Sequence, residues 1–147
     1  MPTPTSTAST APTCIPLQRR YPAHPASVSR MRHSITDAAT EGALGPISPE
    51  QTDALLLIAS ELATNAVAHA CQQDNTDELF EVTLWTADQH LWVAVADSSP
   101  EPPAQREPDA GSSNGRGLLL VSLLAATWGN APRAGGFGKV VFAGLQL

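Results

Sequence analysis

Residues 48–70 are the segment that most constrains the fold of this chain. Ser48 precedes a proline, and Ser48 and Gln51 have the spacing of a capping box, in which two side chains satisfy N–H groups at a helix start. Apolar residues then recur every three or four positions, as on one buried face of a helix: Leu55, Ile58, Leu62 and Ala66. The pattern predicts an amphipathic helix that runs to about Ala70 and needs an apolar surface to cover.

Two segments with alternating apolar residues, 79–85 and 91–97, supply such a surface. The residues between them are typical of a turn, so the two segments predict an antiparallel hairpin. Similar patterns predict further elements: a first strand at 15–21, a helix from Pro25 that ends at Gly42, Gly45 and Pro46, a helix at 118–126 and a last strand at 139–147. A helix stripe facing a hairpin indicates a two-layer α/β fold.

Composition and charge limit the classes of function. The chain has 147 residues, which suits one domain, and its formal net charge is −6. Its one lysine, Lys139, and its arginines are scattered, so it lacks the cationic stripe with which proteins bind nucleic acid directly. No apolar run approaches the roughly 20 residues that a membrane span needs. We therefore expect neither direct nucleic-acid binding nor membrane insertion.

The N-terminal segment, residues 1–14, consists mostly of Thr, Pro, Ser and Ala. It has too few apolar residues to offset the entropy cost of ordering, so we expect a disordered tail before a domain at 15–147. The segment also lacks the basic start and apolar centre of a signal peptide. Cys14 and Cys71 show no metal-ligand spacing and are compatible with a reducing compartment, so we expect a cytoplasmic protein.

Polar residues recur at regular spacing on the helix predicted at 48–70. Glu61, Asn65 and His69 are four residues apart and share one helical face, at the border of the apolar stripe. A carboxylate and a carboxamide so placed could orient an attacking hydroxyl and bind Mg²⁺, which prefers oxygen ligands. An ordinary pair of polar side chains on a helix surface gives the same pattern, and His69 also suits a helix end.

Two further positions suit a nucleotide. Asp97 ends a strand and shares its apolar face, where a carboxylate could accept a hydrogen bond from the exocyclic amine of adenine; an Asp that begins a turn is the alternative. Gly115 and Gly117 precede a helix whose N–H groups and dipole favour a phosphate, and Arg116 could add a bidentate contact. A tight turn explains the two glycines equally well.

The order of these features along the chain resembles the GHKL (histidine-kinase-like) ATPase superfamily, which includes histidine kinases and type II topoisomerase ATPase subunits. Within it, four segments look like the small anti-sigma-factor serine/threonine kinases of actinobacterial type. These segments are ELATNAVAHA (61–70), VAVADSSP (93–100), GRGLLLVSLLA (115–125) and GKVVFAGL (138–145). The resemblance covers about residues 15–147.

The resemblance implies an α/β sandwich of the Bergerat type, in which helices cover one side of a mixed, mostly antiparallel sheet. It also implies bound ATP and Mg²⁺, with residues 101–114 as a lid. In that arrangement Glu61 is the catalytic general base, Asn65 is the Mg²⁺ ligand and Asp97 accepts a hydrogen bond from adenine. The phosphates then lie at the GRGL motif, which consists of Gly115, Arg116, Gly117 and Leu118.

The resemblance also implies partners. The family's phosphorylation substrate is a serine on an anti-anti-sigma (STAS-type) protein, and its other partner is a sigma factor. This chain would then be an ATP-binding regulator that phosphorylates one partner and sequesters the other. The sequence leaves the oligomeric state open, a homodimer included. It also leaves open a detached ATPase domain of a two-component sensor, which the lack of a phosphoacceptor helix disfavours.

The chain departs from the family pattern near the predicted nucleotide. The family's Asp-x-Gly-x-Gly segment reads Asp97-Ser98-Ser99-Pro100-Glu101 here, without either glycine and with an added negative charge. Where the family often has a threonine near the adenine-binding aspartate, we expect Val140, which cannot form a side-chain hydrogen bond. These departures favour a second hypothesis, a non-catalytic partner-binding module with weak or no nucleotide binding.

Overall fold

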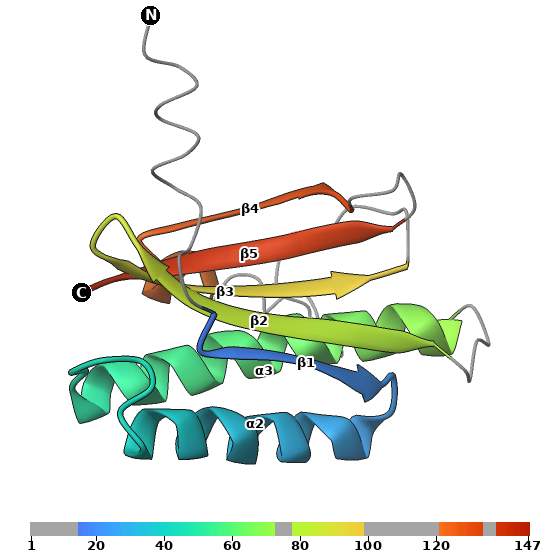
Figure 1. Ribbon diagram of the computed structural model, residues 1–147. Helices are drawn as coiled ribbons and strands as arrows, with labels where there is room; N and C mark the ends of the chain where they lie inside the picture. The colour runs from blue at the N-terminus through green and yellow to red at the C-terminus, as the bar shows by residue number, and fades with distance from the viewer. Residues whose placement is uncertain (1–14, 73–77, 99–120, 134–137) are drawn as a thin grey trace, which may run out of the picture.

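The computed structural model describes residues 15–72, 78–98, 121–133 and 138–147. Its elements form two layers, a five-stranded sheet and a pair of helices that cover one face of it (Figure 1). The elements are β1 (Leu17–Pro22), α2 (Pro25–Thr40), α3 (Pro49–Gln72), β2 (Leu79–Ala87), β3 (His90–Asp97), β4 (Thr127–Pro132) and β5 (Lys139–Gln146). The two-layer α/β fold predicted from the sequence is confirmed.

The sheet has the strand order β1-β2-β3-β5-β4, and every pairing among these described strands is antiparallel. The mostly antiparallel sheet is therefore confirmed, although the described strands do not include a parallel pairing of the kind found in a mixed sheet. β2 and β3 form the predicted hairpin, and its turn residues Asp88 and Gln89 both have positive φ. Two such residues suit the tight turn whose twist matches that of the strands.

α3 begins where its sequence predicts. The Gln51 N–H group donates to Ser48 Oγ at 3.0 Å, and the Ser48 N–H group donates to Gln51 Oε1 at 2.8 Å. This reciprocal capping box satisfies N–H groups that a helix start otherwise leaves without a partner. The helix continues past the predicted end at Ala70 to Gln72, and its length carries one polar face along the sheet.

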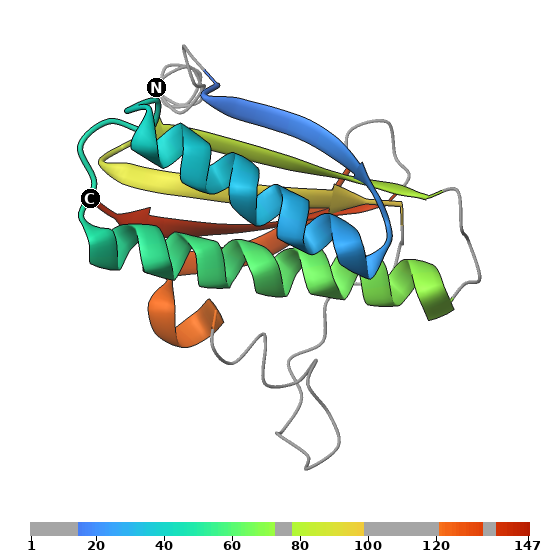
Figure 2. The ribbon, with the colours of Figure 1, turned by 90° about the horizontal axis from the view of Figure 1, so that it is seen from below.

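Mostly aliphatic side chains fill the space between the two layers. Met31 and Ile35 of α2 and Leu55 and Ile58 of α3 are fully buried. The sheet faces them with alternate residues of each strand, as the hairpin pattern predicts. These residues are Phe80, Val82 and Leu84 on β2 and Leu91, Val93 and Val95 on β3. Figure 2, seen from the helix side, shows α2 near β1 and α3 crossing β3 and β5.

The C-terminal part of the chain differs from the sequence prediction. The sequence predicts a helix to Ala126, but in the described residues the helix ends at Leu124 and the chain continues as β4. β4 pairs with β5 at the edge of the sheet. It contains Gly129 and Pro132, residue types that are depleted in strands and that an edge position tolerates. The sequence pattern therefore missed this strand.

Three predicted features lie outside the described residues and stay predictions. They are the tail at 1–14, the lid at 101–114 and the GRGL motif of Gly115, Arg116, Gly117 and Leu118. Among the helices of the described segments, none is both long and apolar enough to cross a membrane.

Candidate functional site

The end of β3 and the start of β5 lie side by side at the position predicted to bind the adenine base of ATP. Asp97 is the last residue of β3 and stands opposite Lys139, the first residue of β5. Gly138 precedes Lys139 with a φ of +94°, and a Cβ atom there would collide with the Asp97 carbonyl oxygen. Glycine tolerates both conditions. The close approach of the two strands at this point therefore depends on Gly138.

The Lys139 ammonium group makes three polar contacts. Its Nζ atom donates to Asp97 Oδ1 and to Asp97 Oδ2, each at 3.1 Å, and lies 2.9 Å from His69 Nδ1 on α3. An ammonium group has three N–H donors, so these contacts use all of them when the imidazole nitrogen accepts. The same imidazole nitrogen lies 4.0 Å from Asp97 Oδ2. We call this group the Asp97–Lys139–His69 cluster.

The cluster is buried between the helix layer and the sheet. The Asp97 and Lys139 side chains are 6% and 5% exposed, and the His69 side chain is 20% exposed. A buried charge is costly unless an opposite charge compensates it, so Asp97 and Lys139 each make the burial of the other tolerable. The carboxylate predicted to accept a hydrogen bond from adenine therefore already accepts two from a cation of the same chain.

Lys139 is a site residue that the sequence pattern did not reveal. Val140 follows it on β5, but the Val140 side chain does not face Asp97. Val140 pairs with Ala96 and lines a cavity on the other face of the sheet. Side chains alternate along a strand, so Lys139 is in phase with the buried Val141. This alternation could have indicated that Lys139 is a site residue, because a lysine in phase with a buried apolar face needs an acidic partner.

Glu61, Asn65 and His69 lie in a row on one face of α3, as their spacing predicts. Successive members are about 6 Å apart along the helix axis, given the rise of an α-helix. All three residues are half-buried, and His69 joins the row to Lys139. The structure thus brings the predicted row and Asp97 to the same side of the sheet.

Burial raises the pKa of the Glu61 carboxyl above its ordinary value. The cause is desolvation, which disfavours the charged form of a carboxyl group. A general base works best when its pKa is close to the working pH, so the shift moves Glu61 toward the properties that this task requires.

The row of Glu61, Asn65 and His69 suits the metal and phosphates of a nucleotide. The Asp97–Lys139–His69 cluster suits its adenine base less well. Proteins commonly hold Mg²⁺ with one or two side-chain oxygens together with phosphates and water, and Asn65 can supply one such oxygen. In the part of the chain that the structure describes, no three His, Cys, Asp or Glu side chains could hold a metal by themselves. An adenine amine would have to share the Asp97 carboxylate with Lys139. Lys139 and an adenine amine would therefore compete for this carboxylate.

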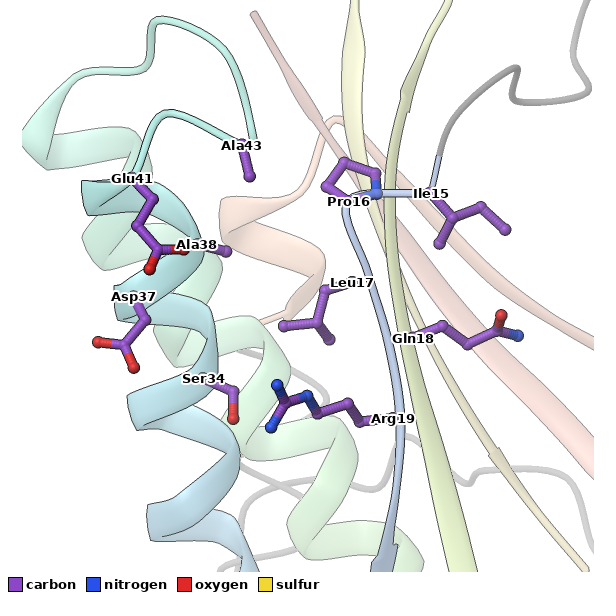
Figure 3. Close-up of a pocket in the computed structure, with 10 residues that line it drawn as sticks. All are labelled: Ile15, Pro16, Leu17, Gln18, Arg19, Ser34, Asp37, Ala38, Glu41 and Ala43. Atoms are coloured by element: carbon purple, nitrogen blue, oxygen red, sulfur yellow. The ribbon is translucent and has the colours of Figure 1, made fainter.

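Two cavities lined by described residues lie away from the cluster. One, of about 450 Å³, lies between β1 and α2, and Figure 3 shows Arg19 reaching from β1 toward Ser34 on α2. The other, of about 390 Å³, lies on the face of the sheet opposite α2 and α3, where its lining includes Trp85, Trp92 and Phe142. Neither cavity contains a residue predicted to bind nucleotide.

Comparison with known families agrees with this fold. A family model described as the histidine kinase-like ATPase domain matches residues 21–141, from β1 into β5. The chain belongs to this family. The resemblance to the GHKL superfamily is thereby confirmed, and membership indicates an ATP-binding domain, usually one that takes ATP with Mg²⁺. No curated protein matches the chain. The narrower resemblance to anti-sigma-factor kinases stays a prediction, as do the roles of individual residues.

Proposed function

We propose that this protein is an ATP-binding regulatory domain of the anti-sigma-factor kinase type. It transfers phosphate to a serine of an anti-anti-sigma (STAS-type) protein and sequesters a sigma factor. One observation carries the proposal, namely the half-buried Glu61 carboxyl, whose pKa is raised. It lies one helical turn from Asn65, on the face of α3 that leads to the Asp97–Lys139–His69 cluster.

The residues of the row have separate tasks in this proposal. Glu61 accepts the proton of the serine hydroxyl as the serine oxygen attacks the γ-phosphate of ATP, and ADP leaves. Asn65 offers its carboxamide oxygen to Mg²⁺, which when bound neutralises phosphate charge. Phosphoryl transfer requires little covalent chemistry from the protein, so the main contributions of these side chains are positioning and charge stabilisation.

A second function has an observation of its own in its favour, the ion pair between Asp97 and Lys139. A domain whose base-recognising carboxylate is held by an internal cation can bind a protein partner without nucleotide. In this alternative the fold is a non-catalytic partner-binding module, and Glu61 has no chemical task. The replacement of both family glycines after Asp97 by Ser99 and Glu101 favours the same alternative.

The substitution Glu61→Gln separates the two functions. Glutamine keeps the shape of glutamate and removes the proton acceptor, so the variant should bind ATP with Mg²⁺ but lose transfer by about 100-fold or more. Glu50→Gln, on the exposed first turn of the same helix, is the matched control and should keep full transfer. The assay measures labelled phosphate incorporated into a panel of candidate STAS-type proteins, together with pull-down of those proteins with and without ATP.

Each result of this assay selects one function. Transfer that survives in Glu61→Gln would refute the role of Glu61 as general base. Absence of transfer in the wild type, with partner binding that is equal with and without ATP, would establish the partner-binding module instead.

A further inference from the structure

We propose that Lys139 determines nucleotide specificity: it holds the Asp97 carboxylate and thereby makes the site a poor acceptor for the exocyclic amine of adenine. The inference rests on the proposed function, because it assumes that nucleotide binds beside α3 at this end of the sheet. It goes further in naming the residue that limits affinity for ATP and the chemical group of the base that is affected.

The first argument is the geometry of the ammonium group. Nζ of Lys139 lies 3.1 Å from each oxygen of Asp97, so a single ammonium group contacts both oxygens. An adenine amine is also a donor of positive polarity. Two such donors compete for the same carboxylate, and the one that carries a full charge makes the stronger hydrogen bonds.

The second argument is that Lys139 is held in place from several sides. Its backbone lies between two strands, opposite Asp97 on β3 and opposite Pro132 on β4. Its side chain is 5% exposed, and its Nζ atom also contacts His69 on α3. If the ammonium moved away, Asp97 would lose its compensating charge in a buried position, which is unfavourable. ATP binding would have to supply that free energy, so the affinity of the wild type for ATP should be low.

A matched pair of nucleotides isolates this effect. Purine riboside triphosphate (PTP) has a hydrogen atom where ATP has the exocyclic amine, and the two share N1 as an acceptor, the ribose and the triphosphate. While Lys139 holds Asp97, the amine gains little from the carboxylate, so we expect affinities for ATP and PTP within about threefold of each other. A carboxylate released from Lys139 can accept a hydrogen bond from the amine of ATP, and PTP has no donor at that position, so ATP should then be preferred.

The test is calorimetric titration of the full chain with ATP and with PTP, each with Mg²⁺. Lys139→Thr should bind ATP about tenfold or more tighter than the wild type and should prefer ATP over PTP by a similar factor. Lys139→Gln is a second variant, to be used if the threonine variant fails to fold. It keeps a neutral donor beside Asp97 and should shift the preference in the same direction. Thermal melting establishes that each variant is folded.

Val140→Thr is the matched control. It introduces the same side chain one position along β5, on the opposite face of the sheet. It should leave both affinities at their wild-type values. An effect as large as that of Lys139→Thr would overturn the proposal.

Two other results would also overturn it. A wild type that prefers ATP over PTP by about tenfold or more would show that Lys139 does not block the amine. Folded Lys139 variants that bind both nucleotides without preference would show the same, and in either case nucleotide binding itself would stand. If neither the wild type nor any folded variant binds either nucleotide, the proposal and the nucleotide-dependent function fall together.

Discussion

The face of the sheet that α2 and α3 cover carries mainly aliphatic side chains and a buried ion pair, whereas the opposite face carries a cluster of aromatic side chains. On the covered face, Val93 is buried beneath α3, and Asp97 and Lys139 form the ion pair at the end of the same layer. On the other face, which neither α2 nor α3 covers, Trp85 stacks on Trp92 with ring centroids 6.1 Å apart. Helices exclude water from the first face, and aromatic neighbours partly shield the second.

The side chains of β5 alternate between these two faces. Lys139 and Val140 are neighbours on β5, yet Lys139 faces the helix layer and Val140 faces the aromatic side. Strand alternation alone decides which of them meets Asp97. A substitution at Lys139 therefore alters the candidate site, whereas one at the neighbouring Val140 alters the aromatic face.

Asp97→Ala should have the largest effect on stability, because it leaves Lys139 buried without its anion. Removal of one partner from a buried ion pair costs about 3–5 kcal/mol, and the free energy of unfolding in urea should fall by that amount. The double variant Asp97→Leu with Lys139→Met replaces both charges with apolar side chains and should recover most of the loss. A loss below about 1 kcal/mol in Asp97→Ala would match an exposed pair and contradict the covered position of the cluster.

Gly144→Ala should have an intermediate effect and should act on the aromatic face. A Cβ atom at Gly144 would lie 2.9 Å from Cζ3 of Trp92, so the indole must move. Overpacking of this kind costs about 1–3 kcal/mol, which urea unfolding measures. Tryptophan fluorescence should change, while the affinity for ATP should stay at the wild-type value. A changed affinity would mean that the two faces are coupled.

Glu61→Gln should have the smallest effect on stability, and its sign depends on pH. Burial raises the pKa of Glu61, so the folded state favours the protonated carboxyl and ionisation lowers stability. This penalty is absent below the unfolded pKa, grows as pH rises, and is complete above the folded pKa. The variant should therefore melt at a higher temperature than the wild type at neutral pH, and at about the same temperature near pH 3.

The exposed Glu50→Gln variant is the control for this pH dependence, since Glu50 lies on the first turn of the same helix. It should show no comparable trend. Lower stability of Glu61→Gln at neutral pH would indicate that the Glu61 carboxylate is stabilised in the fold rather than desolvated.

Local patterns were sufficient to predict α2, α3, the hairpin and the layer arrangement. The capping box of Ser48 and Gln51 and the apolar stripe of α3 are signals contained within a few residues. β4 is different, because it contains Gly129 and Pro132 and forms against an edge that β5 provides. β4 forms because it can pair with β5, so the sequence of β4 alone did not predict a strand.

The candidate site divides in the same way. The row of Glu61, Asn65 and His69 follows from a spacing of four on a helix, and that spacing can be read from the sequence. The contact of Lys139 with Asp97 joins residues 42 positions apart, and its contact with His69 spans 70 positions. Those contacts depend on strand register and on the close approach at Gly138, which spacing along the chain does not encode.

Nucleotide binding beside the row on α3 is tested most directly by NMR titration of the isotope-labelled protein with ATP and Mg²⁺. We predict that the largest changes in amide chemical shift lie at Asn65 and His69 and around Lys139. Residues near Arg19, in the cavity between β1 and α2, and near Trp92, on the aromatic face, should change little. Changes centred on either of those two regions, with none along α3, would contradict the site.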